Sequence, residues 1–315
     1  MATTCTVTGG AGFIGSHLTD ELVRHGCRVR VFDDFSTGLR ENLAHQPNVE
    51  IATGTLTDLA AVEKAVTGSQ IIYHLGALAS VARSVESPLV SHAACATGTL
   101  NVLDAARRNG VKRVVFAASS SAYGGAAGDA DDPQTEDLLP AAKSPYAAAK
   151  LAGEFYMQAF TATYGLETAR LRFFNIFGPR QRADSPYSGV IAIFIKALTE
   201  GRRPTVHGDG LQSRDFTFVA NAVQALVKAG SAPAAVGNVY NVGTGKSVTV
   251  IELVAALNRI LGTKLDPIRG ETRAGDVKYS RADISRTRKD LGYEPTATFE
   301  EGLRKTVEWY QNMKS

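Results

Sequence analysis

The chain has 315 residues, 44% of them hydrophobic and 21% charged, which is enough apolar material for a core and too much for disorder. The formal net charge is +3 and the arginines are scattered, so we expect neither nucleic acid nor an anionic membrane as a partner. Three cysteines cannot all pair, which suits a reducing compartment. The chain begins MATTCTVTGG, without a basic or long apolar leader, so we expect a cytoplasmic protein.

Short apolar runs bounded by turn residues recur along the first half of the chain and predict buried strands. These runs cover residues 4–8, 28–32, 49–52, 71–75, 114–118 and 168–173. Stretches with helical spacing alternate with them, at Ile14, Leu18 and Leu22, then at 100–108 and 147–160. This alternation predicts an α/β fold with a Rossmann-type, doubly wound parallel sheet that binds ligands at the carboxyl ends of its strands.

The pattern loosens after Asn175 into segments rich in glycine and proline. We therefore expect a Rossmann domain over 1–175 and a smaller C-terminal α/β lobe, which binds substrate, over 176–315. The strand-like run 238–242 is expected to return to the first sheet, so the division is not one clean cut. Residues 126–137 are rich in Gly, Asp and Pro, and this composition predicts an exposed loop.

The first predicted strand runs directly into TGGAGFIG, after which a helix begins. In this context Gly9 permits a tight turn, Gly12 lets the backbone approach a pyrophosphate and Gly15 allows close helix packing. The N-terminus of the helix attracts the phosphate charge. We therefore predict a dinucleotide site here, to which Phe13 and Ile14 also contribute.

Asp33 ends the second predicted strand, at about the distance beyond Gly15 that this motif requires. A carboxylate at this place accepts hydrogen bonds from the adenosine ribose and repels a 2′-phosphate, so it selects NAD over NADP. Asp34 either contributes to the same site or solvates the turn. We therefore predict NAD as the cofactor.

Tyr146 and Lys150 stand four residues apart in the helical stretch SPYAAAKLAGEF, so their side chains share one face of the helix. Tyr146 is a candidate acid/base, but lowering the pKa of a phenol to neutrality takes roughly 4 kcal/mol, which Lys150 and the positive charge of NAD can supply. Tyr310 and Lys314 repeat the spacing, but only Tyr146 follows a strand with a hydroxyl-rich end, Ser119-Ser120-Ser121.

Together TGGAGFIG, Asp33, SSSAYG and YAAAK resemble the extended short-chain dehydrogenase/reductases, specifically their nucleotide-sugar epimerases and dehydratases. HLGALASVARSVESP, RFFNIFGPRQ, GDGLQSRDF and RAGDVKYSRAD also match, so the resemblance covers nearly the whole chain. It implies a catalytic triad of Ser119, Tyr146 and Lys150, in which Ser119 bonds to the sugar hydroxyl that loses its proton. Lys150 also contacts the cofactor. Ser120 and Ser121 either contact the sugar or serve only the turn.

The same resemblance implies a nucleotide-sugar site in the second lobe. Arg214 and Arg273 would clamp the diphosphate, Asn175 would bond beside it, and Asp276 would hold the nucleotide ribose. His207 would stack on uracil or would be an ordinary loop histidine. The other implied contacts are those of Leu56 with NAD, and those of Ser80, Val190 and Ser280 with the sugar.

The resemblance also separates the possible reactions. Related dehydratases usually carry an Asp-Glu pair after the triad hydroxyl and related decarboxylases a Glu, whereas this chain carries Ser120 and Ser121. Without that carboxyl group no acid/base is in place to eliminate water, so we expect an isomerase that inverts C4 of a UDP-hexose. Tyr146 would remove the C4 hydroxyl proton, NAD would take the hydride, and the 4-keto sugar would turn over before the hydride returns. Small residues at Ser80 and Ser280 predict that UDP-GlcNAc and UDP-GalNAc are accepted besides UDP-glucose and UDP-galactose.

Three positions depart from the usual pattern of this group and predict weaker NAD binding. Thr55 replaces an Asp that often contacts adenine, Cys95 replaces an Asn near the cofactor, and Asn221 replaces an Asp after the RDF segment.

Alternatives remain at the level of the substrate and of the activity. A UDP-glucuronate 4-epimerase, with Arg83 or Arg182 facing the carboxylate, is one alternative. A catalytically silent NAD-sensing protein is a more remote one. The resemblance further implies a homodimer formed through helices near 100–108 and 147–163, and no metal site is predicted.

Overall fold

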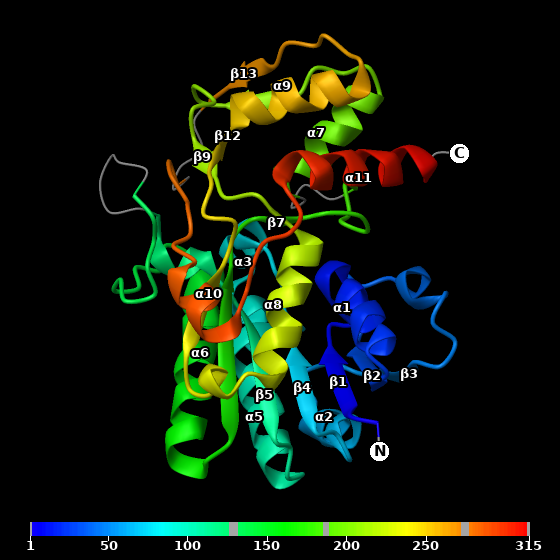
Figure 1. Cartoon of the computed structure of the whole chain (residues 1–315), viewed down its shortest axis with the longest axis vertical. Helices are drawn as coiled ribbons and strands as arrows, with labels where there is room; N and C mark the ends of the chain where they lie inside the picture. Colours follow the sequence, from blue (N-terminus) through cyan, green and yellow to red (C-terminus); the bar gives the residue numbers. More distant parts are fainter. Residues whose placement is uncertain (1, 126–131, 185–188, 272–276, 314–315) are drawn as a thin grey trace.

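The computed structural model describes residues 2–125, 132–184, 189–271 and 277–313 (Figure 1). Its lower part is a seven-stranded sheet in the order β11-β6-β5-β4-β1-β2-β3, in which every pair of neighbours is parallel. The order reverses at β1, which lies between β2 and β4, so the predicted doubly wound fold is confirmed. The strands are β1 (Thr4–Thr8), β2 (Arg28–Asp33), β3 (Glu50–Thr53), β4 (Ile71–His74), β5 (Arg113–Ser119), β6 (Glu167–Phe173) and β11 (Val239–Val242).

Helices cover both faces of this sheet. α1 (Phe13–Arg24) and α8 (Val219–Ser231) pack on one face, and α2 (Leu59–Val66), α5 (Gly98–Arg108) and α6 (Pro145–Tyr164) on the other. Side chains alternate along β5, so that Val115 joins the core under α1 and α8 while Val114 and Phe116 join the core under α5 and α6. Because both of their faces are buried, the central strands β4 and β5 are nearly continuous apolar runs, whereas the edge strand β3 is mostly exposed.

Local sequence sets the limits of α6, which carries the candidate acid/base. The Ser144 hydroxyl accepts a hydrogen bond from the Ala147 backbone N–H at 3.1 Å, and Pro145 occupies the first turn. Gly165 ends the helix in the left-handed conformation, at φ 68°. The helix is therefore longer at both ends than the predicted 147–160.

The upper part of Figure 1 holds α7 (Val190–Thr199), α9 (Val250–Leu261) and α11 (Phe299–Asn312). α9 and α11 each begin with a capping box. Among the described residues, three two-stranded ladders complete this part: β7 (Ile176–Phe177) with β10 (Thr217–Phe218), β9 (Ser213–Arg214) with β12 (Val248–Thr249), and β8 (Thr205–His207) with β13 (Ile268–Gly270). The remaining short helices are η1 (Arg40–Leu43), α3 (Val81–Glu86), α4 (Pro88–His92), η2 (Ala93–Thr97), η3 (Ser120–Tyr123), η4 (Pro233–Ala235) and α10 (Ser285–Leu291).

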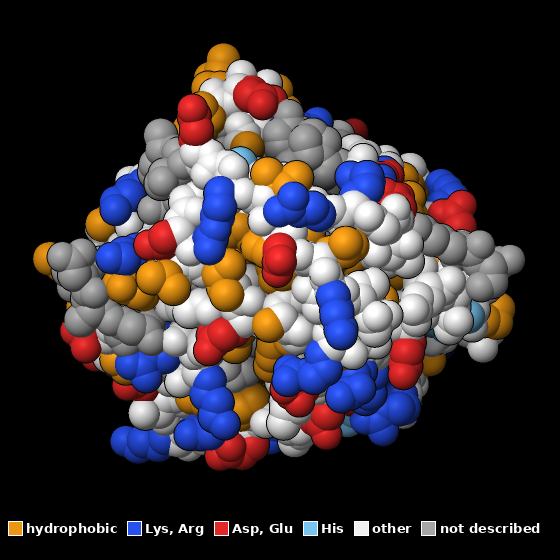
Figure 2. Space-filling model, turned by 90° about the horizontal axis from the view of Figure 1, so that it is seen from above, with side chains coloured by type: hydrophobic (Ala, Val, Ile, Leu, Met, Phe, Trp, Pro, Cys, Tyr) orange, Lys and Arg blue, Asp and Glu red, His pale blue; other side chains and the backbone are white. Residues whose placement is uncertain are grey.

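The chain crosses between the two parts more than once. α8 and β11 both follow residue 175, yet α8 covers the sheet and β11 pairs with β6, as the run 238–242 predicted. The division into 1–175 and 176–315 is therefore one of sequence order, and we propose it in that sense only. Seen from above, basic and acidic side chains are interspersed on the face that Figure 2 shows. Within the described part of the chain no helix is long and apolar enough to span a bilayer.

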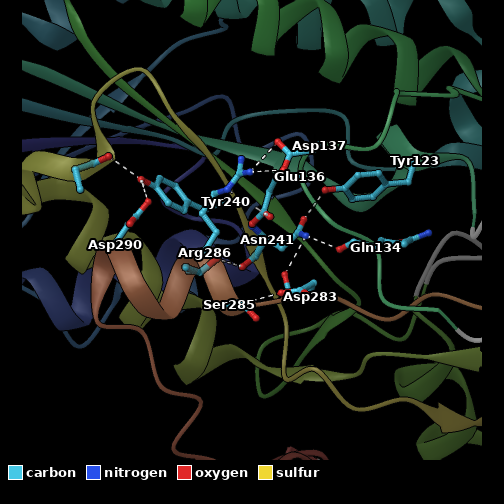
Figure 3. Close-up of polar contacts among 12 residues, drawn as sticks. Tyr123, Gln134, Glu136, Asp137, Tyr240, Asn241, Asp283, Ser285, Arg286 and Asp290 are labelled. Atoms are coloured by element: carbon cyan, nitrogen blue, oxygen red, sulfur yellow. Dashed lines mark hydrogen bonds and ion pairs between the residues drawn. The ribbon is translucent and has the colours of Figure 1, made fainter.

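A buried polar cluster joins β11 of the sheet to the segment before α10 and to the turn after β5 (Figure 3). The backbone N–H of Asn241, on β11, donates to Glu136 Oε1 at 2.8 Å, and its side-chain amide donates to the carbonyls of Gln134 and Asp283 at 2.7 and 3.1 Å. The Tyr123 hydroxyl donates to Asn241 Oδ1 at 2.6 Å. Because Tyr123 ends η3, the cluster ties the turn that follows β5 to the C-terminal segment.

Candidate active site

The glycine-rich turn lies between β1 and α1, at the point where the strand order reverses. A Cβ on Gly9, whose φ is 70°, would lie 2.7 Å from the backbone nitrogen of Gly76, and a Cβ on Gly15 would overlap the Gly9 carbonyl oxygen. At Gly12 a Cβ would meet only that oxygen, at 3.1 Å, so this position borders open space before the N-terminus of α1. The turn thus leaves space for a pyrophosphate in front of the N-terminus of α1. Phe13 and Ile14 form the first turn of that helix.

The buried carboxylate of Asp33 follows at the end of β2. Its Oδ2 accepts from the Ala11 backbone N–H and its Oδ1 from the Phe35 backbone N–H, both at 2.9 Å. Burial raises the pKa of Asp33, and these two bonds oppose the rise. Each oxygen keeps a lone pair for a ribose hydroxyl, so the residues present fit NAD. Asp34 is exposed and accepts from the backbone N–H and hydroxyl of Ser36, at 2.9 and 2.6 Å, within the turn.

Leu56 lies beside this turn. Its side chain would be 2.8 Å from a Cβ on Gly76, and its carbonyl accepts from Asn101 Nδ2 at 2.9 Å. Thr55, at the first of the three departures, is exposed and shares a hydrogen bond of 3.1 Å with the Thr57 hydroxyl. The Leu56 side chain therefore borders the segment that carries Gly76, next to the glycine-rich turn.

The other two departures are buried. Cys95 lies in η2, a π-helical turn, and faces both Tyr146 and Lys150. Asn221 donates from Nδ2 to the Ala297 carbonyl at 2.8 Å and accepts from the Ala297 N–H at 3.1 Å. An aspartate could not make both bonds, so this asparagine serves the packing of α8.

Lys150 lies on the inner face of α6, against β5. It is buried, and its Nζ donates to the Ala117 carbonyl at 2.8 Å and stands 4.7 Å from the ring centre of Phe116. Burial lowers the pKa of Lys150, while Cys95 and Glu154 raise it. The ammonium is thus held at a fixed place one turn from Tyr146.

Tyr146 is half-buried in the first turn of α6, opposite the end of β5. Burial raises the pKa of its phenol and Cys95 adds to the rise, whereas a hydrogen bond with Ser119 opposes it. The Tyr146 phenol thus faces Ser119, which favours its charged form.

The Ser119 hydroxyl is held within its own turn. Its Oγ accepts from the Ser121 backbone N–H at 3.2 Å and from the Ser121 hydroxyl at 2.9 Å. The Ser120 hydroxyl is half-buried and forms no bond with the described residues. Among the described residues of this turn, three serine hydroxyls and no carboxyl group thus follow one another at the end of β5.

The predicted nucleotide-sugar residues of the second lobe come partly together. Arg214 Nη1 donates to the carbonyls of Ser213 and Lys278 at 2.8 and 3.3 Å. Buried Ser280 lies on the adjoining segment, where its carbonyl accepts from the Asp215 backbone N–H at 2.7 Å. These hydrogen bonds thus hold the segment that carries Arg214 beside the segment that carries Ser280. Arg273 and Asp276 lie outside the described residues.

The remaining predicted contacts lie on separate elements. Asn175 is exposed at the end of β6, and half-buried Val190 opens α7. His207 on β8 donates from Nδ1 to the Glu271 carbonyl at 2.9 Å. Ser80 caps α3 by accepting from the Arg83 backbone N–H at 3.1 Å. These four residues thus lie on four different segments of the fold.

Sequence reasoning missed His74, which is fully buried under the site. Its Nε2 lies 3.0 Å from the Thr99 hydroxyl, which itself donates to the Cys95 carbonyl, so Nε2 carries the proton. Nδ1 then accepts from the Thr8 hydroxyl at 2.7 Å. Burial lowers the pKa of His74 to about 3, and Lys150 adds to this. The available signal was one polar residue within an otherwise apolar strand.

Glu154 is a second residue that sequence reasoning missed. It continues the series of Tyr146 and Lys150 on α6 and forms a buried ion pair with Arg172 on β6, at 2.8 Å. Arg172 stacks on the Tyr123 ring, 4.7 Å from its centre. The repeated spacing of four residues was the signal that could have identified it.

The fold and the site together define an NAD-binding enzyme of the short-chain dehydrogenase/reductase type. The chain belongs to the NAD dependent epimerase/dehydratase family, whose model matches residues 5–243. It is 39% identical to a UDP-glucose 4-epimerase of Mycolicibacterium smegmatis, over 97% of this chain and 98% of the relative.

Solved structures agree with this assignment. The UDP-glucose 4-epimerase of Thermotoga maritima, solved with UDP-glucose, superposes with a TM-score of 0.94 at 35% identity, covering 99% of this chain and 100% of that one. A UDP-N-acetylglucosamine 4-epimerase from Methanobrevibacter ruminantium M1, solved with UDP-N-acetylmuramic acid, gives 0.93 at 37% identity and 99% of each chain. The chain is therefore an isomerase, an NAD-dependent nucleotide-sugar 4-epimerase. This confirms the predicted family, fold and cofactor and leaves no support for a silent sensor.

Proposed function

We propose that this enzyme interconverts UDP-glucose and UDP-galactose and also accepts UDP-GlcNAc and UDP-GalNAc. One observation carries the assignment of C4 inversion: Tyr146 and Ser119 meet at the end of β5, and the two residues after Ser119 are serines, which cannot act as the acid/base of an elimination. The relatives named above support the same reaction.

In the proposed mechanism the chain handles the proton. Tyr146 takes the C4 hydroxyl proton and later returns it, and Ser119 donates a hydrogen bond that favours the phenolate. Lys150, whose Nζ donates to the Ala117 carbonyl at 2.8 Å, is held one helical turn from Tyr146. When bound, NAD supplies the acceptor and donor of hydride, held by the Gly9–Gly15 turn, Asp33 and Leu56.

For the substrate, we propose that the second lobe grips the nucleotide and leaves the sugar free to turn. Arg214 and Arg273 hold the diphosphate with Asn175, Asp276 holds the ribose, and His207 lies against the base. Ser80, Val190 and Ser280 line the sugar. Small side chains at Ser80 and Ser280 leave room for a 2-acetamido group, which favours tolerance of N-acetylated sugars.

A charged sugar such as UDP-glucuronate is the second candidate substrate, and one side chain favours it. Arg83 is half-buried on α3, next to Ser80, and its guanidinium has no partner among the described residues. Arg182, in contrast, pairs with Asp184 at 2.6 Å, so its charge is already engaged. Arg83 is therefore the cation that would meet a C6 carboxylate.

We also propose a cytoplasmic homodimer. The exposed apolar side chains of α3 and α4, Val85, Leu89 and Val90, lie beside Phe155 and Tyr156 of α6 on helices that pack together. Between α4 and α6 runs a groove of about 320 Å³. A second copy of this surface would bury these side chains. We propose that this surface comprises α4 together with the expected stretches 100–108 and 147–163.

Proton NMR of the purified enzyme with UDP-glucose, UDP-GlcNAc and UDP-glucuronate, assayed separately, tests the proposal. We expect C4-inverted product from the first two, and a loss of about 10²- to 10⁴-fold in rate for Tyr146→Phe, since the acid/base is removed. If only UDP-glucose gave product, this would contradict the proposal that the sugar site has room for a 2-acetamido group. Turnover of UDP-glucuronate alone would establish the second candidate instead, and undiminished turnover by Tyr146→Phe would contradict the mechanism.

A further inference from the structure

The turn after β5 contains an ordered pair of hydroxyls whose hydrogen-bond direction is determined. Ser121 donates twice to Ser119 Oγ, once from its backbone N–H at 3.2 Å and once from its hydroxyl at 2.9 Å. A serine hydroxyl has one proton and two lone pairs. Both lone pairs of Ser119 are therefore in use, and its one proton is left to donate elsewhere.

The acceptor for that proton lies across the turn. Tyr146 faces Ser119 from the first turn of α6, and Ser119 favours the charged form of the phenol, against the effect of burial on its pKa. The other titratable groups facing this site in the described residues are Cys95 from η2 and Lys150 from α6 itself. The proton of Ser119, whose two lone pairs are filled by Ser121, is thus left to point toward the phenol of Tyr146.

We infer that Ser121 is a positioning residue of the reaction: it fills both acceptor sites of Ser119 and so directs the Ser119 proton to Tyr146 or to the substrate oxygen. The inference rests on the proposed function. It goes further in stating that Ser119 acts as a donor only. With no free lone pair, Ser119 cannot take the C4 hydroxyl proton, so that proton passes to Tyr146 directly.

Loss of the Ser121 hydroxyl has a defined chemical consequence. One lone pair of Ser119 becomes free, so its proton is no longer committed to Tyr146 and its hydroxyl can turn. The phenolate then loses part of its stabilisation, and a higher pH is needed to form it. Substrate affinity does not depend on this bond, so the effect belongs to kcat.

The test compares Ser121→Ala with Ser121→Thr and with a matched control, Ser69→Ala. Ser69 shares a buried hydroxyl–hydroxyl bond of 2.6 Å with Thr6, before β4 and far from the end of β5, so its removal costs similar stability without touching the site. The readouts are kcat and KM for UDP-glucose as functions of pH. For Ser121→Ala we expect kcat to fall about 3- to 10-fold at pH 7, its acid limb to move to higher pH, and KM to change less than 2-fold.

Ser121→Thr keeps the hydroxyl and should restore kcat and the acid limb, and Ser69→Ala should match the wild type. A Ser121→Ala enzyme with unchanged kcat and pH profile, or one altered in KM alone, overturns the inference. Tyr146→Phe is assayed in parallel to separate the two ideas. If Tyr146→Phe is inactive while Ser121→Ala behaves as wild type, only the role of Ser121 fails; if the wild type inverts none of the UDP-sugars, the proposed function fails.

Discussion

At the scale of single residues, burial decides how each polar group of the site behaves. Asp33, Lys150 and His74 are all removed from water, yet each is paired so that its required form persists. Asp33 meets backbone N–H groups and Lys150 a carbonyl. His74 is neutral between two threonine hydroxyls. The site is thus built from groups whose partners are fixed before any ligand arrives.

His74 makes stability depend on pH in a defined direction. Its folded-state pKa of about 3 lies far below the ordinary value of 6.5, so between these values the unfolded chain binds a proton that the folded chain excludes. The free energy of unfolding therefore falls as pH decreases, and we expect His74 to account for about 2 kcal/mol between pH 6.5 and 5.

Urea unfolding of the wild type and of His74→Gln at these two pH values measures this contribution. The variant should be less stable at pH 6.5 but should lose less stability on acidification, because residue 74 no longer titrates. The same loss in both proteins would show that His74 isn't the source of the pH dependence.

At the scale of elements, the turn η3 depends on partners distant in sequence. It begins after Ser119 and ends at Tyr123, whose hydroxyl bonds to Asn241 on β11, as Figure 3 shows. Arg172, which is paired with Glu154, lies over the Tyr123 ring. The placement of the catalytic hydroxyls therefore depends on α6, β6 and β11 as well as on β5.

Tyr123→Phe should lower stability by about 1 kcal/mol and reduce kcat about 3- to 10-fold, because the lost bond frees the turn that holds Ser119. Tyr240→Phe is the control: it removes a phenol hydroxyl on β11 that bonds to the Ala234 carbonyl at 2.6 Å and to Asp290 Oδ2 at 3.2 Å, outside that turn. Thermal unfolding and kcat for UDP-glucose are measured for both variants. Equal kcat values in the two would mean that the Tyr123 bond contributes only to stability.

At the scale of the whole molecule, the exposed apolar surface of α3, α4 and α6 is the feature that a single copy leaves uncovered. Of the two large apolar side chains that α4 exposes, Leu89 has the larger exposed fraction, 82%. If two copies meet there, Leu89→Glu places a charge in an apolar interface and should give a monomer by size-exclusion chromatography with light scattering. Ile268→Glu, on β13 at 47% exposure, is the control and should leave the dimer intact. A wild type that elutes as a monomer contradicts the proposal.

By itself the sequence determined the alternation of strands and helices, the glycine-rich turn, Asp33 and the pairing of Tyr146 with Lys150, because these depend on periodicity and on neighbours within one or two turns. It also identified β11 as a strand that returns to the sheet.

Only the tertiary structure decided which groups distant in the chain meet. The pairing of His74 with Thr8 and Thr99, of Glu154 with Arg172, and of Asn241 with Tyr123 joins residues from separate elements. The direction of the Ser119 proton also emerged only from the folded turn, since it depends on which lone pairs are filled. The sequence shows no periodic pattern at these residues, because packing between separate elements brings them together.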